Sequence, residues 1–203
     1  MLQAREYHAD YCITLGEDRW SCVYEGGQIA KTVLTRSADP DSICGTIRLF
    51  FRDGSLAFWE LRHSLAYLLQ FGISVSADGD CVFIQTWDQG LFCYDARTGE
   101  QRWRTKSKRG VTNLFVCGPT LLCQQHGHAL LMLDSKTGEV LKERRVTSWG
   151  FTALSHRYIL CEIHSGKWEI LDAASMETLR SFSQRDYETE LARARAELLP
   201  GTL

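Results

Sequence analysis

Three histidines are the residues of this sequence whose type and spacing come closest to a metal site. His126 and His128 flank Gly127, His164 follows His126 by 38 residues, and Glu162 is two residues before His164. Imidazole nitrogens and carboxylates are ligands that zinc and related metals accept. Histidines in turns that face solvent or a partner would give the same pattern. We favour this second interpretation, so the sequence predicts no metal site.

No catalytic constellation accompanies these histidines. The sequence contains no GxSxG, HExxH, P-loop or GxGxxG motif. Asp95, Asp134 and Asp172 are acidic residues at regular spacing, but an aspartate at the start of a turn accepts hydrogen bonds from the amides ahead of it. Turn formation therefore explains these acids without any chemistry. The sequence predicts a protein that is not an enzyme and that carries no cofactor.

The segments that carry these residues repeat along the chain. Asp95 and Asp134 each begin an Asp-x-x-Thr-Gly-Glu turn and lie 39 residues apart, and Asp172 begins a less regular turn 38 residues later. This period is just under the roughly 40–50 residues of a propeller blade. An apolar run and a shorter turn precede each Asp, the shorter turns being Asp88-Gln89, Gly127-His128 and Ser165-Gly166. Each unit is predicted to be a small antiparallel sheet that neighbouring units cover on both faces.

The same spacing extends upstream with weaker matches. Glu60 takes the place of the turn Asp, 35 residues before Asp95, and Asp53-Gly54 falls on the shorter turn between two apolar runs. Asp-Gly in that context predicts a hairpin. A fifth hairpin is predicted around Gly26-Gly27. Five units could close a ring, and we favour a closed or nearly closed propeller over an open arc whose exposed edges would need a partner or a second copy.

Two segments resemble the repeat of quinoprotein-like β-propellers, the pyrroloquinoline-quinone type. They are Tyr-Asp-Ala-Arg-Thr-Gly-Glu-Gln-Arg-Trp at 94–103 and Leu-Asp-Ser-Lys-Thr-Gly-Glu-Val-Leu at 133–141. The resemblance is good over 73–144 and partial over 150–182. It implies an all-β fold, a small β-propeller or propeller-like arc of about five short antiparallel blades. The family's enzymes hold their quinone in a much larger ring, so the resemblance implies the scaffold and no cofactor.

The end of the chain has a different character. We predict a propeller-like domain at 1–183 and a C-terminal helical tail at 184–203. Residues 184–199 are mostly good helix formers, and Tyr187, Leu191, Ala194 and Leu198 recur at helical spacing. This stripe predicts a helix that docks on the propeller or on a partner and ends before Pro200.

Charge and composition exclude several classes of function. The net charge is −2 and the pI is near 6.3, so no overall field favours nucleic acid or an anionic membrane. We interpret the basic run at 102–109 as a solvated loop. The apolar runs are too short to span a membrane, and the first residues carry no secretory signal, so a cytoplasmic location is expected. The eight cysteines lack metal-ligand spacing and are predicted to be reduced and buried.

Equivalent turns of successive blades lie on one face of a propeller, which predicts where a partner binds. Trp87, His126 and His164 occupy equivalent places in three short turns. The full predicted set is Trp87, Gln89, His126, His128, His164 and Trp149. We expect a non-enzymatic module that binds another protein, and a second copy of the chain is one candidate partner. The alternatives are an immunity protein that neutralises a toxin by direct binding and a small-molecule or metal-binding enzyme domain.

Overall fold

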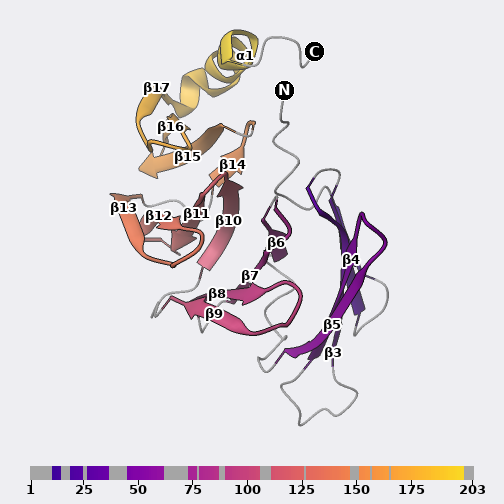
Figure 1. Cartoon of the computed structure of the whole chain (residues 1–203). Helices are drawn as coiled ribbons and strands as arrows, with labels where there is room; N and C mark the ends of the chain where they lie inside the picture. Colours follow the sequence, from indigo (N-terminus) through magenta and orange to yellow (C-terminus); the bar gives the residue numbers. More distant parts are fainter. Residues whose placement is uncertain are drawn as a thin grey trace.

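Four antiparallel sheets follow one another along the chain, and a helix follows the last of them (Figure 1). The structure is a computed structural model that describes residues 11–14, 19–24, 27–36, 45–61, 73–76, 78–86, 90–105, 111–125, 127–146, 151–155, 157–164 and 166–198. In every sheet the strands pair in sequence order, so the described strands form antiparallel meanders.

The first sheet is larger than the other three. It contains β1 (Tyr11–Thr14), β2 (Arg19–Val23), β3 (Ile29–Arg36), β4 (Gly45–Phe51) and β5 (Leu56–Leu61). The second contains β6 (Ile73–Val75), β7 (Cys81–Thr86), β8 (Gly90–Asp95) and β9 (Gln101–Arg104). The third contains β10 (Val111–Cys117), β11 (Thr120–Gln125), β12 (Ala129–Asp134) and β13 (Val140–Arg145). The fourth contains β14 (Phe151–Ala153), β15 (Tyr158–His164), β16 (Lys167–Asp172) and β17 (Thr178–Ser183).

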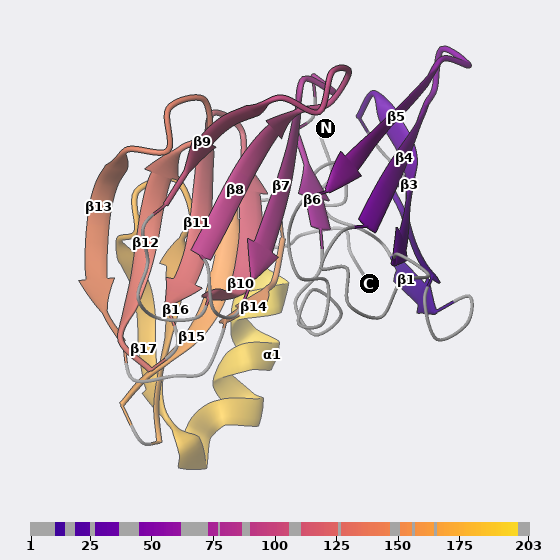
Figure 2. The same cartoon turned by 90° about the horizontal axis from the view of Figure 1, so that it is seen from below.

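The four sheets stand side by side in an open arc (Figures 1 and 2). Three buried apolar clusters join them in order, the first sheet to the second, the second to the third and the third to the fourth. Among the described residues no buried cluster joins the fourth sheet back to the first. The arc, and not the closed or nearly closed ring that we favoured from the sequence, is therefore what these residues form.

The central strands of the second and third sheets are apolar on both faces because each sheet lies between two neighbours. In the second sheet Phe83 and Cys93 belong to the cluster shared with the third sheet, and Val82 and Phe92 belong to the cluster shared with the first. All four side chains are fully buried. The hairpins predicted around Gly26-Gly27 and Asp53-Gly54 are both present but share the first sheet, which gives four sheets where about five blades were expected.

A tryptophan on the outermost strand of one sheet docks on the long turn of the next. Trp59 in β5 donates its indole N–H to the carbonyl oxygen of Ala96 at 3.2 Å, and Trp103 in β9 donates to that of Ser135 at 3.0 Å. Trp59 also covers Gly99, where the φ of +72° and the lack of a side chain let the ring lie on the backbone. Trp103 therefore packs the outer strand of the second sheet against the third sheet.

The position of Trp59 shows that the first sheet was predicted out of register. Because Trp59 docks on the second sheet as Trp103 docks on the third, β5 is the equivalent of β9. The turn at 51–56 is then a shortened long turn, in which Phe51 donates its N–H to Ser55 as Asp95 donates to Glu100. The prediction that Glu60 takes the place of the turn Asp is wrong. The Asp53-Gly54 pair fits either the short turn or the long turn of a blade, so the sequence alone does not place it.

Cationic side chains replace the tryptophan between the third and fourth sheets. Lys142 in β13 donates from Nζ to the Ser175 carbonyl oxygen at 2.6 Å. Arg144, on the same strand, donates to the Met176 carbonyl oxygen at 3.0 Å and forms an ion pair with Glu169. The Glu169 side chain is almost fully buried, and its charge is therefore balanced inside the interface between the sheets.

The predicted C-terminal helix is confirmed, and it docks on the fourth sheet (Figure 2). A short 3-10 turn, η3 (Gln184–Asp186), leads into α1 (Tyr187–Leu198). Leu191 and Ala194 are the buried residues of α1, and they pack with Leu160, Ile170 and Phe182 of the fourth sheet. The two ends of the arc therefore differ, because the helix covers the last sheet while the first sheet keeps exposed apolar side chains.

Candidate partner-binding rim

The turns between strands divide between two rims of the arc. The long turns at 51–56, 95–100, 134–139 and 172–177 lie next to one another, as the docked Trp59 and Trp103 and the 3.4 Å ion pair between Arg97 and Asp53 show. We call this side the docking rim. The short turns after β7, β11 and β15 close the opposite ends of the same central strands, and we call that side the short-turn rim.

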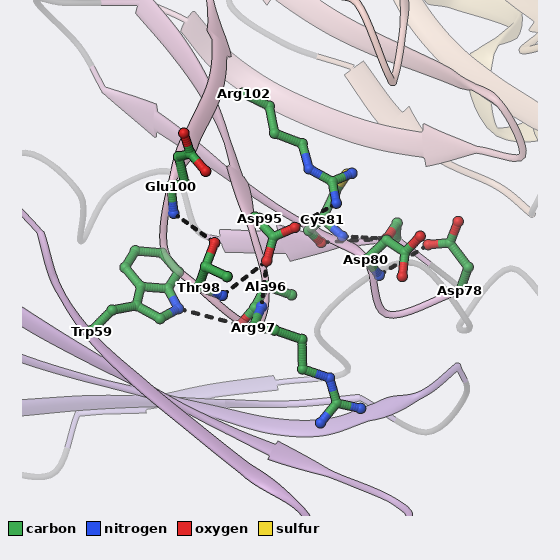
Figure 3. Close-up of polar contacts among 11 residues, drawn as sticks. Trp59, Asp78, Asp80, Cys81, Asp95, Ala96, Arg97, Thr98, Glu100 and Arg102 are labelled. Atoms are coloured by element: carbon green, nitrogen blue, oxygen red, sulfur yellow. Dashed lines mark hydrogen bonds and ion pairs between the residues drawn. The ribbon is translucent and has the colours of Figure 1, made fainter.

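Each acid at the start of a long turn binds the backbone of its own turn. Asp95 Oδ1 accepts the N–H of Arg97 at 2.9 Å and that of Thr98 at 2.8 Å (Figure 3). Asp134 and Asp172 accept the equivalent pair of amide hydrogen bonds. The prediction that the regular acids belong to turn architecture is confirmed. Many polar groups of the docking rim therefore form hydrogen bonds within the rim itself.

These hydrogen bonds hold the turn acids ionised. The N–H of Thr98, followed by the Arg102 guanidinium, lowers the pKa of Asp95 to about 2. Arg102 Nη2 donates to Asp95 Oδ2 at 2.6 Å (Figure 3). The pKa of Asp134 is lowered chiefly by the corresponding turn amide. The folded state thus favours the charged form of both carboxylates.

We expect the protein to lose stability as the pH falls from about 5 to about 2, because acids with a lowered folded-state pKa stabilise the fold only while they are ionised. Burial raises the pKa of Asp172, but hydrogen bonds headed by that from Arg157 outweigh it and the net shift is downward. Urea unfolding midpoints measured across this range test the expectation. The Asp95→Asn variant should show a shallower pH dependence than the wild type, and an identical slope would contradict the assignment.

The structure describes only part of the predicted partner-binding set. His128 lies at the short-turn rim, where its N–H donates to the Gln125 carbonyl oxygen at 3.1 Å and its side chain is partly exposed. The backbone of His164 ends β15 at the same rim and pairs with Lys167. The other predicted residues lie outside the described part of the chain, and they are Trp87, Gln89, His126 and Trp149.

The described short turns differ in how much of the protein covers them. Gly127 is exposed, and a Cβ atom built on it would have no other atom within 4 Å. The carbonyl oxygen of Gly166, in the fourth sheet, instead accepts the N–H of Gln184 at 2.7 Å. The Trp168 indole also donates to the Gln184 side chain at 2.6 Å. Among the described residues, none from another part of the fold lies against the Cβ position of Gly127, whereas the turn of the fourth sheet is joined to the helical segment.

Five cysteines have described side chains and are free thiols, and they are Cys81, Cys93, Cys117, Cys123 and Cys161. All of them except the half-buried Cys117 are buried. Burial raises the pKa of Cys123 and of Cys161 to about 12, which keeps both in the thiol form. Cys81 lies beside Arg102, whose Nη1 donates to the sulfur at 3.0 Å (Figure 3). The pKa of Cys81 is lowered, first by a hydrogen bond with Cys93 and also by the nearby positive charge.

The described residues contain no group of three or more histidine, cysteine, aspartate or glutamate side chains placed to hold a metal ion. None of the helical segments in this part of the chain has the length and apolar character needed to span a membrane.

One exposed surface was missed in the sequence analysis. Leu56 and Phe58 in β5 are 57% and 53% exposed, while Ala57 and Trp59 between and after them are buried. The alternation along this strand was visible in the sequence. The sequence pattern predicts one arm of a hairpin here, but it does not indicate whether both faces of the first sheet are covered.

Small antiparallel sheets that pack side by side in an arc, with the outer strand of one sheet docked on the next, are the blades of a β-propeller. A sequence profile of the family described as outer membrane protein assembly factor BamB, with repeats of the pyrroloquinoline-quinone type, matches residues 16–195. The chain belongs to this family, which confirms the resemblance seen in its repeats. No curated protein sequence matches it.

Solved structures with this fold include two β-propellers of natural proteins. BamB from Moraxella catarrhalis superimposes with a TM-score of 0.56 and 18% identity, over 87% of this chain and 52% of that one. The β-propeller domain of Cps50 (Swd1) from Myceliophteria thermophila gives a TM-score of 0.55 and 14% identity, over 87% of this chain and 60% of that one. The chain therefore spans between half and two thirds of each. At these identities the likeness shows the fold alone.

Proposed function

We propose that this protein is a non-enzymatic binding module whose short-turn rim receives another protein. The observation that carries the proposal is the difference between the long turn and the short turn of the third sheet, because Gly138 lies under Trp103 and Gly127 does not lie under a docked side chain of the described residues. The docking rim is occupied by contacts within and between sheets, such as the tryptophan at Gly99 and the amides bound by Asp95. Gly127, on the short-turn rim, is exposed, and no described residue other than its chain neighbours lies within 4 Å of its Cβ position.

The residue types predicted for the short-turn rim suit protein recognition. Tryptophan supplies a large rigid surface, and interface residues of this kind carry most of the binding energy. Histidine and glutamine side chains add hydrogen bonds that fix orientation. We propose Trp87, Gln89, His126, His128, His164 and Trp149 as the contact set, with the tryptophans as its apolar anchors.

Affinity capture with matched variants tests this proposal. The tagged wild-type chain is expected to recover a partner from native lysate, and a variant with alanine at His126, His128 and His164 should recover about tenfold less, a loss typical of hot-spot residues. The control carries alanine at Glu100 and Lys136, which are exposed on the docking rim, and it should recover the wild-type amount. Equal recovery by both variants would reject the short-turn rim as the binding surface.

The identity of the partner decides between the narrower functions. The family's description as an assembly factor supports a protein as the partner. Recovery of a toxin whose activity the chain blocks would identify an immunity protein. The cytoplasmic location expected from the sequence remains part of the proposal, and fractionation of cells that express the tagged chain tests it.

A further inference from the structure

The outer face of the first sheet carries two exposed apolar residues, Leu56 and Phe58, on its edge strand β5. By register this face of β3, β4 and β5 includes Lys31, Arg48, Phe50, Leu56, Phe58 and Glu60. It also includes Thr46 and Val33, and Val33 is buried. Leu56 and Phe58 are among the most exposed large apolar side chains of the described chain. The opposite face of the same sheet is buried against the second sheet.

The equivalent face of the next two sheets is covered by a preceding sheet. Gly99 and Gly138 lie under Trp59 and Trp103, so close that an added Cβ atom would overlap the rings. Gly54 occupies the corresponding turn of the first sheet with a similar positive φ, and nothing lies within 4 Å of its Cβ position. The first sheet therefore exposes a surface that the rest of the array keeps buried.

This face is nevertheless not built to receive another blade in the usual register. One position after the start of each long turn, Ala96, Ser135 and Ala173 donate their N–H groups to the preceding hairpin turn and leave room for a docked side chain. Arg52 makes the same backbone bond in the first sheet, to Gln28 at 2.9 Å. Its guanidinium returns to its own sheet and donates to the carbonyl oxygens of Tyr24 and Gly27. A large, exposed cation thus stands where a docking blade needs a small residue.

The charges on the outer face point to a different occupant. Arg48 lies over the Phe58 ring at 5.5 Å and Lys31 over the Phe50 ring at 5.9 Å. Glu60 adds a negative charge, one residue pair along β5 from Phe58. A face with exposed apolar residues and both signs of charge can meet its own copy across a twofold axis, with cations opposite anions. We propose that two copies of this chain associate through the outer face of the first sheet.

The size of the face fits a reversible dimer. Five strands spaced about 4.8 Å apart, each with about six residues rising 3.3 Å, present a projected face of roughly 480 Å². Two such faces bury a projected area of roughly 950 Å², without the additional area of the protruding side chains. This is close to the ~1,000 Å² of total buried area at which specific interfaces begin. An interface of this size is expected to dissociate in the micromolar range.

Sedimentation velocity over a concentration series tests this proposal. The wild type should pass from monomer to dimer between about 1 and 100 µM, and the Leu56→Lys/Phe58→Lys variant should remain monomeric. Val140→Lys/Leu141→Lys is the matched control, because these two apolar residues of β13 are each 55% exposed but lie on the third sheet. The control should dimerise as the wild type does. A monomeric wild type, or a dimer that loses as much affinity in the control as in the test variant, overturns the proposal.

A charge exchange separates self-association from binding to any other surface. Arg48→Glu and Glu60→Arg should each weaken the homodimer at least tenfold, because each places like charges opposite one another. Mixing the two variants should restore association, since each then offers the charge that the other needs. Circular dichroism confirms that both variants are folded. Failure of the mixture to associate more tightly than either variant alone rejects the twofold contact, and a partner protein that competes for this face would then be its occupant.

Discussion

Replacing Gly99 with alanine should destabilise the protein by about 3 kcal/mol. One part of this cost is overpacking against Trp59, and the other is the left-handed backbone conformation, which is unfavourable for a residue with a Cβ atom. The new Cβ atom would lie 2.3 Å from Cγ of Trp59, and the φ of Gly99 is +72°. The tryptophan cannot withdraw without losing its hydrogen bond to Ala96. Urea unfolding followed by fluorescence measures the loss as a lower midpoint.

Gly54 offers a matched control for this substitution. Its φ is +83°, but no atom lies within 4 Å of its Cβ position, so Gly54→Ala should cost only the backbone term of about 1 kcal/mol. Gly138→Ala, where Trp103 lies 2.6 Å from the Cβ position, should resemble Gly99→Ala. If all three variants lose the same stability, the docked tryptophans do not limit what the turns accept.

Arg144→Ala should destabilise the protein by about 2–3 kcal/mol, because it removes one partner of a nearly buried ion pair. Arg144 binds Glu169, the Met176 carbonyl oxygen and Thr178 from the neighbouring sheet. Lys167 remains 3.3 Å from Glu169 and offsets part of the loss. Thermal or urea unfolding measures the change in the free energy of unfolding.

Two further variants show whether the buried charge causes this loss. Arg145→Ala removes an exposed cation from the same strand and should change stability by less than about 0.5 kcal/mol. Adding Glu169→Gln to the Arg144→Ala background removes the unbalanced charge and should recover part of the stability. A double variant less stable than Arg144→Ala would show that Glu169 acts mainly through its other partners.

The parts of the fold that were predicted correctly have strong local chemistry. Asp95 and Gly99, and Asp134 and Gly138, combine a side chain that binds turn amides with a residue that accepts positive φ. Local requirements of this kind are visible in one sequence. The helical spacing at 187–198 predicted α1 for a similar reason.

The features that were missed depend on contacts between sheets. Met176 occupies the turn position equivalent to Gly99 and adopts a φ of +57°. A methionine in the sequence does not indicate a left-handed backbone conformation. Trp59 marks the register of the first sheet only through its contact with a turn almost forty residues later. The ion pair of Arg144 and Glu169 likewise joins two sheets across 25 residues. Periodicity along the chain cannot report such partners.

The predicted binding surface remains a prediction. The strand ends show that the short turns share one rim, as the repeat spacing required, and His128 lies on it. The exposed pair Leu56 and Phe58 was not expected, because a ring would have covered the outer face of the first sheet. The error about ring closure therefore concealed the clearest exposed apolar surface of the molecule.

The direction of the tryptophan contacts has a consequence for how the protein forms during synthesis. Trp59 and Trp103 each reach forward along the chain, to a turn that a ribosome makes only after the sheet that carries the tryptophan. During synthesis, one face of each sheet that carries such a tryptophan thus stays uncovered until the next sheet has left the ribosome. The sheets are then expected to pack one after another, starting from the N-terminal side. The fourth sheet is covered by α1, which follows it directly along the chain.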